Sequence, residues 1–189
     1  MSRKSIFRKL LVLAGLAVVL LARGCGNSQV DFSPAGKISL PFGKSFNYED
    51  ILVVRAVDGD TLKLENGERV RLIGIDTPET YESVKLYRDS QKSGQDIKTI
   101  RALGKRASNF TRGLVEGKRV RLEFDLEKRD RYKRLLAYVY LKDGTFVNAE
   151  IIKQGYASLM TYPPNIKYVD SFKELYQQAR ENNRGLWKE

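Results

Sequence analysis

Histidine is absent from this 189-residue sequence, and cysteine occurs once, as Cys25. Without histidine there is no Ser-His-Asp triad, no histidine general base and no histidine-ligated zinc site. A single cysteine also excludes an intramolecular disulfide and a cysteine cluster. Acid–base chemistry must therefore be carried out by carboxylates, lysine, tyrosine or metal-bound water.

The apolar run at 10–22, LLVLAGLAVVLLA, is too short for a comfortable membrane-spanning helix and suits a signal peptide. The Gly-Cys pair after it resembles a bacterial lipoprotein cleavage site, which would attach Cys25 to the membrane through lipid, although Arg23 departs from that pattern. A plain secretory signal, an uncleaved anchor and a buried core helix are the alternatives. We expect 1–25 to be a signal peptide or lipoprotein-type anchor, and the protein to be extracytoplasmic, either secreted or lipid-anchored to the cell envelope.

Acidic residues are the minority charge, with 23 Asp and Glu against 34 Lys and Arg, a net charge of +11. Five of the 34 basic residues and no acids precede Cys25, so a chain cleaved there keeps 29 basic residues and a net charge of +6. This charge suits a polyanionic partner such as nucleic acid, although solubility alone explains many basic proteins. Residues 26–49 are rich in glycine, proline and serine and predict a linker with a short strand near 37–40. The working domain is then 50–189, expected as a monomer.

The stretch 58–79 reads DGDTLKLENGERVRLIGIDTPE and predicts a three-stranded meander. Asp58-Gly59 and Asn66-Gly67 are strong signals for tight hairpin turns. Polar and apolar residues alternate around them, which predicts strands at about 51–57, 60–65 and 68–75.

Four acidic residues lie at the ends of these predicted strands. A meander brings its first turn close to the far end of its third strand, so Asp58 and Asp60 can meet Asp76 and Glu79. Like charges held together raise one another's pKa or need a cation, and carboxylates are the oxygen ligands that Ca²⁺ and Mg²⁺ prefer. Taken singly, Asp58-Gly59 is typical of an ordinary turn and Asp76-Thr77-Pro78 of an ordinary loop. Together they favour a site.

Periodicity beyond the meander indicates a small α+β domain with an antiparallel sheet. It predicts an exposed loop over 80–97, a helix over 98–116, strands over 118–125 and 134–141, and a helix over 147–154. A last helix is expected to start near Ser171, which opens a capping-box spacing, and to end at Gly185. Five strands with a helix between the third and fourth is the order of an OB-fold barrel.

Five blocks in this order resemble the staphylococcal nuclease (thermonuclease) family: VDGDT, VRLIGIDTPE, RYKRLLAYVY, NAEIIKQGYA and NRGLW. The resemblance covers about residues 50–188. It implies a five-stranded OB-fold-like antiparallel barrel with about three helices. It also implies a calcium-dependent nuclease that hydrolyses the phosphodiester bonds of DNA and RNA with low sequence specificity.

The resemblance assigns metal-binding roles to the acidic stretch. Asp60, Asp76 and the backbone carbonyl of Thr77 would hold Ca²⁺, with waters completing the coordination. Asp58 matches a family acid that lies close to the metal, through water. The ligand types alone fit Mg²⁺ equally well.

The resemblance also assigns the catalytic groups. Glu79 matches the general base that activates the attacking water, and Arg71 and Arg134 match two catalytic arginines. Guanidinium groups bind phosphate oxygens in a bidentate fork, which lysine cannot do. Tyr132 and Tyr162 are candidates for substrate contact. The plain structural alternatives are sheet-surface arginines and tyrosines that pack at the barrel rim.

Two positions depart from the family pattern. Lys133 stands where many relatives have glycine, and a positive backbone dihedral there would strain lysine and displace Arg134. Met160 lies near a position that is often aromatic in relatives, which weakens base stacking. Two non-catalytic alternatives follow: a nucleic-acid-binding OB-type module tethered at the cell envelope, and an envelope scaffold that binds nucleic acid or another anion.

Overall fold

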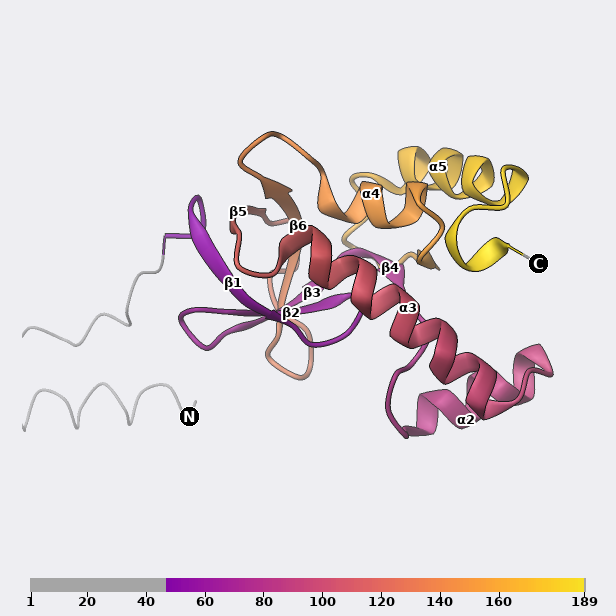
Figure 1. Ribbon diagram of the computed structural model, residues 1–189. Helices are drawn as coiled ribbons and strands as arrows, with labels where there is room; N and C mark the ends of the chain where they lie inside the picture. The colour runs from indigo at the N-terminus through magenta and orange to yellow at the C-terminus, as the bar shows by residue number, and fades with distance from the viewer. Residues whose placement is uncertain (1–46, 189) are drawn as a thin grey trace, which may run out of the picture. The chain divides into compact units, whose positions relative to one another are not determined.

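A closed five-stranded barrel forms the centre of the computed structural model, which describes residues 47–188 (Figure 1). The strands are β1 (Ile51–Ala56), β2 (Thr61–Leu64), β3 (Arg69–Leu72), β5 (Arg119–Glu123) and β6 (Leu135–Leu141). They follow the order β1-β2-β3-β6-β5 around the barrel. Every neighbouring pair is antiparallel except β3 and β6, which run parallel. The predicted meander and OB-fold-like barrel are therefore confirmed, with one parallel pair that alternation alone does not reveal.

The predictions for the N-terminus fall almost entirely outside the described residues. They are the signal or anchor at 1–25, most of the linker at 26–49 and the short strand near 37–40, and they stay predictions. Within residues 47–188, no helix combines the length and the apolar character that crossing a membrane requires.

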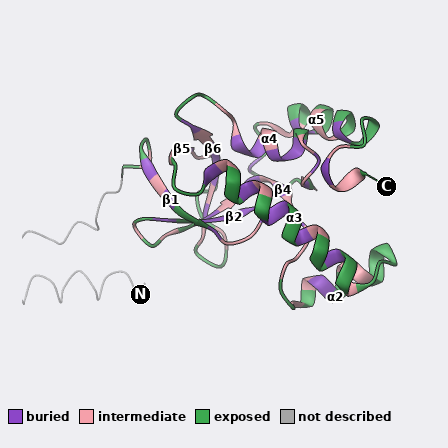
Figure 2. Cartoon of the chain, in the orientation of Figure 1, coloured by how far each residue is buried: buried purple, intermediate pink, exposed green. Residues whose placement is uncertain are grey.

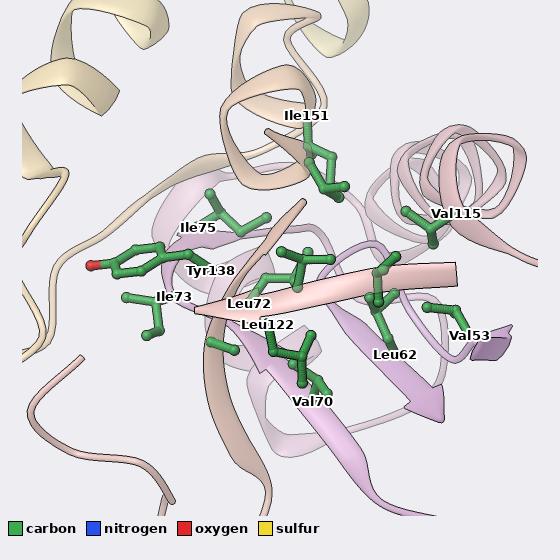
Figure 3. Close-up of a cluster of buried hydrophobic side chains, with 14 of the residues drawn as sticks. Val53, Leu62, Val70, Leu72, Ile73, Ile75, Val115, Leu122, Tyr138 and Ile151 are labelled. Carbon is green, nitrogen blue, oxygen red and sulfur yellow. The ribbon is translucent and has the colours of Figure 1, made fainter. Parts of the chain in front are cut away.

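Alternating side chains of the barrel strands form the core. Val53, Leu62 and Leu72 are buried completely or nearly so. Figure 3 shows them meeting Val115 and Ile151, which come from helices α3 (Ile97–Val115) and α4 (Val147–Lys153). Burial of this apolar surface is the main force that holds the helices on the barrel, and it makes the barrel a firm support for the residues at its ends.

Residues 80–97 are not simply an exposed loop, because they contain helix α2 (Val84–Ser93). The Ser83 side chain caps the helix by accepting a hydrogen bond from the Leu86 amide, and Gly94 ends it with a φ of 70°. Leu86 is the single fully buried residue of α2, and the helix packs on α3 (Figure 1). The loop prediction was wrong because one buried leucine among charged residues gives almost no periodic signal. With α2, the described residues hold four α-helices instead of about three.

The predicted third strand divides at Gly74 into β3 and β4 (Gly74–Asp76). Gly74 has a φ of 84°, and a Cβ there would lie 2.4 Å from the Phe172 ring, so both the bend and the packing require glycine. Beyond the bend β4 leaves the barrel and pairs with β7 (Ser158–Met160) in a separate two-stranded sheet. This change of direction determines where Asp76 and the residues after it lie.

The last helix, α5 (Val169–Glu181), starts two residues before the predicted Ser171. Its N-cap is Tyr168, which makes no side-chain capping bond, so the predicted capping box does not form. Aromatic packing of Tyr168 around Phe146 and Phe172 fixes this end instead. Gly185 does not end α5 but opens the short 3-10 helix η2 (Gly185–Trp187). The other predicted elements lie within two residues of the observed ones.

Candidate active site

Asp60 joins the two ends of the acidic stretch. It lies in the turn between β1 and β2 and is 7% exposed. Its Oδ2 accepts hydrogen bonds from the Thr77 amide at 3.0 Å and from the Thr77 hydroxyl at 3.1 Å. A Cβ on Gly59 would lie 2.7 Å from the Thr77 side chain, so the close approach of the two turns requires glycine. The turn at Asp58–Asp60 therefore meets the segment after β4, as the meander predicts.

Arg71 projects from β3 between two carboxylates. Its Nη2 donates to Asp76 Oδ1 at 3.0 Å and lies 3.3 Å from Asp60 Oδ2. Its Nη1 donates to the backbone carbonyls of Leu72 at 3.1 Å and Ile75 at 2.8 Å. These bonds hold the guanidinium in one orientation inside the acidic cluster, unlike a mobile arginine on a sheet surface.

Lys85 of α2 occupies the centre of the acidic segment, a role that no sequence motif indicates. Its ammonium donates to the Thr77 carbonyl at 2.9 Å and lies 3.1 Å from both Asp76 Oδ2 and Glu79 Oε1. Asp89, one turn further along α2, lies 3.9 Å away. Because α2 was predicted as a loop, the sequence analysis did not place Lys85 at the site.

Burial has the largest effect on the pKa values in this cluster. It raises the pKa of Asp58, and the neighbouring carboxylates of Asp60 and Glu79 raise it further. Burial also raises the pKa of Asp76, against the opposing effect of the Lys85 ammonium. For Lys85, burial lowers the pKa, but the Asp76 and Glu79 carboxylates outweigh it and the net shift is upward. The cluster thus brings together all four acidic residues that the sequence singles out, and its negative charge is only partly compensated.

The residues predicted to bind calcium lie close together in this cluster. Asp76 and the Thr77 carbonyl converge on one cation, the Lys85 ammonium, and Arg71 links Asp76 to the adjacent Asp60. Oxygen donors of this type are the ligands that hard divalent ions prefer, so Asp76 and the Thr77 carbonyl suit Ca²⁺ or Mg²⁺. Asp60 does not contact the ammonium, and its Oδ2 faces Thr77 and Arg71. No group of three or more acidic, histidine or cysteine side chains between residues 47 and 188 is arranged to hold a metal ion. The predicted set does not need one, because it combines two carboxylates with a carbonyl and waters.

Arg134 lies directly before β6 and binds Asp130 instead of the acidic cluster. Its Nε donates to Asp130 Oδ2 at 2.7 Å, and its amide donates to Asp130 Oδ1 at 2.9 Å. The residue before it, Lys133, has a φ of 64°. This is the positive dihedral that we considered because many relatives have glycine at this position. The parallel register pairs Leu136 with Arg71, so Arg134 lies two residues from the strand partner of Arg71. Strand geometry puts residues 134 and 136 on the same face of the sheet.

The two predicted substrate tyrosines are exposed. Tyr132 is 65% exposed and Tyr162 is 71% exposed, and neither is a packed rim residue. Tyr162 belongs to a turn that also contains Asn165. The Asn165 side chain accepts a hydrogen bond from the Glu127 amide and donates one to the Glu127 carbonyl, both at 2.8 Å. These bonds hold the turn against the loop that precedes Arg134. Met160 of β7 places its sulfur 3.5 Å from Arg71 Nη2.

Comparison with known proteins shows which family the chain belongs to. The family profile described as "Staphylococcal nuclease homologue" matches residues 69–189. Thermonuclease of Staphylococcus intermedius is 39% identical over 153 residues, which cover 78% of this chain and 83% of that protein. Thermonuclease of Staphylococcus hyicus is 30% identical over 180 residues, with coverages of 94% and 95%. SPbeta prophage-derived endonuclease YokF of Bacillus subtilis is 39% identical over 143 residues, with coverages of 73% and 44%. The chain belongs to the staphylococcal nuclease family.

Proposed function

We propose that this protein is a nuclease that uses Ca²⁺ to hydrolyse phosphodiester bonds of DNA and RNA with low sequence specificity. The observation that carries the proposal is the Arg71 guanidinium held between Asp60 and Asp76, with Glu79 joined to the same cluster through Lys85. Membership of a family whose relatives are named thermonucleases and endonucleases supports it. Hydrolysis of nucleic-acid phosphodiester bonds is the activity that both observations support.

Phosphodiester hydrolysis needs a base for the attacking water and positive charge at the phosphoryl oxygens. Glu79 is the carboxylate placed to take the proton from water. Arg71 and Arg134 contribute positive charge through guanidinium groups, which stay protonated throughout. The two carbonyl contacts of Arg71 fix its orientation before substrate arrives, so little reorganisation is needed in the transition state.

Asp60, Asp76 and the Thr77 carbonyl hold the cation in this proposal, with Asp58 reaching it through water. When bound, a hard cation supplies positive charge beside the phosphate. The Lys85 ammonium lies against two of these oxygen donors, so it would compete with a cation for them.

Exposure and charge support the proposed substrate class. Tyr132 and Tyr162 are exposed, although Arg131 and Arg134 lie over the Tyr132 ring. Stacking on such rings accepts any base because every base has a π-face. The net charge, +11 for the full chain and +6 after cleavage before Cys25, favours a polyanion. The protein acts as a monomer outside the cytoplasm, exported by residues 1–25 and either secreted or held at the membrane through Cys25. A labelling experiment with a radioactive lipid precursor, compared between wild type and Cys25→Ala, distinguishes these two fates.

The test is incubation of the purified protein with single-stranded DNA and with RNA, in Ca²⁺ and in a chelator. We expect both substrates to be cleaved with Ca²⁺ and neither with the chelator. Binding without cleavage in Ca²⁺, Mg²⁺ or Mn²⁺ would contradict the proposal and leave a nucleic-acid-binding module.

A further inference from the structure

A groove of about 640 Å³ runs beside α3, outside the cluster described above. One wall is the segment at Thr80 and Tyr81, and the other is one face of α3. The helix contributes its positions 98, 101, 105, 108 and 112, which repeat every three or four residues and so share a face. Exposed and buried positions alternate along α3, and this face is exposed over most of its length (Figure 2).

The groove begins one residue beyond Glu79. Helix α3 lies directly on this segment at Gly104, where a Cβ would come within 2.5 Å of the Glu79 carbonyl oxygen. Arg101 Nε donates to the Thr80 carbonyl at 3.2 Å, and the Thr111 hydroxyl donates to the Gly59 carbonyl at 2.7 Å. The groove therefore has a fixed position relative to the turns that carry the acidic cluster.

The charge of the groove has one sign. Its lining residues include four cations and no acid. The cations are Lys98, Arg101, Lys105 and Arg112. Within residues 47–188, Arg112 pairs with Glu116, and the other three form no ion pair. The whole of α3 carries no acidic residue.

These cations oppose helix stability. Lys98 lies in the first turn, where the helix dipole favours negative charge. Arg101 and Lys105 are like charges four residues apart, a spacing at which they repel each other. A solvated helix face would be more stable with acids interspersed, so this pattern favours an external source of negative charge, beyond the Asp96 N-cap and the Glu116 partner of Arg112.

We propose that the groove holds the phosphate backbone of a single-stranded nucleic acid beyond the bond that is cleaved. The inference rests on the proposed function, since it extends the substrate path away from Glu79. Positions 98 to 112 span about 21 Å of helix, which is long enough to follow several phosphates. Tyr81, on the opposite wall, is 58% exposed and offers an aromatic face for a base.

The test is the triple variant Lys98→Gln, Arg101→Gln and Lys105→Gln in the full chain. Binding of a fluorescein-labelled single-stranded DNA is followed by anisotropy in a chelator, so that cleavage plays no part. Removing one phosphate-binding cation lowers the slope of log affinity against log salt by about 0.7, and for the triple variant we expect roughly a tenfold weaker affinity or more. Glutamine keeps high helix propensity, so α3 should persist, which circular dichroism checks.

The matched control removes three exposed cations elsewhere, with Lys118→Gln, Lys153→Gln and Lys173→Gln. It has the same net charge as the groove variant and should keep most of the affinity and the slope. Equal reductions of affinity in both triple variants would contradict the proposal that the groove binds the phosphate backbone. Should the groove triple not fold, Lys105→Gln alone is compared with Lys118→Gln, and an equal affinity would overturn it. Wild-type protein that binds through the groove but never cleaves would refute the proposed function alone.

Discussion

Lys85 is the residue that most changes how the acidic site is understood. It contacts the Thr77 carbonyl, Asp76 and Glu79 at 2.9 to 3.1 Å, and these are two proposed metal ligands and the proposed base. A tethered ammonium in this place stabilises the carboxylates when no other cation is present. It also competes with any divalent ion that uses the same oxygens.

We expect Lys85→Gln to tighten Ca²⁺ binding by roughly tenfold or more. Two unit charges about 4 Å apart interact by about 4 kcal/mol near a protein surface, and about a third of that is a factor of ten. The same variant should melt at a lower temperature than wild type in a chelator, because Asp76 and Glu79 lose a partner. Isothermal titration calorimetry gives the affinity. Lys92→Gln, on the exposed end of α2, is the control, and equal Ca²⁺ affinities in both variants would contradict the competition.

Asp58 makes stability depend on pH. Its pKa in the folded protein is raised by burial, then by Asp60 and Glu79, above an unfolded value of about 3.9. A raised pKa contributes its stability fully below the unfolded pKa and loses it as the pH rises through the folded pKa. In a chelator, Asp58→Asn should therefore lose less stability than wild type as the pH rises above about 4.

Urea midpoints measured at several pH values test this expectation. The comparison with Asp58→Asn is needed because Glu68 and Glu123 have lowered pKa values and change stability in the opposite direction. The lowered pKa values arise from hydrogen bonds of Glu68 with Arg129 and, against the burial effect, of Glu123 with Lys167. Parallel pH profiles for wild type and the variant would show that Asp58 does not cause the pH dependence of stability.

The positions of Asp60, Asp76 and Arg71 were predictable because they belong to short motifs beside turns with strong signals. Lys133 was predictable as a strained position, and its φ of 64° agrees. Lys85 was not predictable, because its long side chain reaches the site from a helix that the sequence did not reveal. The bond between Arg134 and Asp130 was also missed, since a charged turn gives no sign of which partners will pair.

Among the elements, α2 carries the largest difference between expectation and structure. Leu86 alone anchors it fully in the interior, against α3. We expect Leu86→Ala to lower the free energy of unfolding by about 2 kcal/mol or more, through reduced burial and a residual cavity. Urea denaturation gives this value.

Tyr87→Ala is the matched control for Leu86→Ala on the same helix. Tyr87 is 50% exposed, and a change at such a site usually stays within about 0.5 kcal/mol. Equal effects of the two substitutions would mean that residues 84–93 do not form a packed helix in solution, and Lys85 would then have no fixed place in the site.

Most strands and helices were predicted well because their side chains alternate, or repeat on a helical period, over four or more residues. The division of the third strand at Gly74 was missed, since the glycine lies inside an apolar run and the clash with Phe172 exists only in the folded chain. The start of α5 was missed because aromatic packing, and not a capping side chain, decides it.

At the scale of the whole molecule, the barrel serves as a support for residues that come from separate parts of the chain. The turn after β1, the strand β3, the segment after β4 and the helix α2 all contribute to one charged cluster. Alternation predicts the sheet, but the closure of the barrel and the parallel pairing of β3 with β6 depend on contacts between distant residues. The family resemblance supplied the barrel that periodicity alone did not.

Cleavage of single-stranded DNA by Glu79→Gln, with binding measured in parallel, tests the central claim most directly. We predict that wild type cleaves with Ca²⁺ and not with a chelator, and that the variant is slower by about 10² to 10⁴, the usual contribution of a general base. Its affinity for DNA in a chelator should stay within about a factor of two, since Glu79 lies outside the proposed phosphate groove. Wild-type rates in the variant, or no cleavage by wild type with any divalent ion, would contradict the assignment of Glu79 as the base of a metal-dependent nuclease.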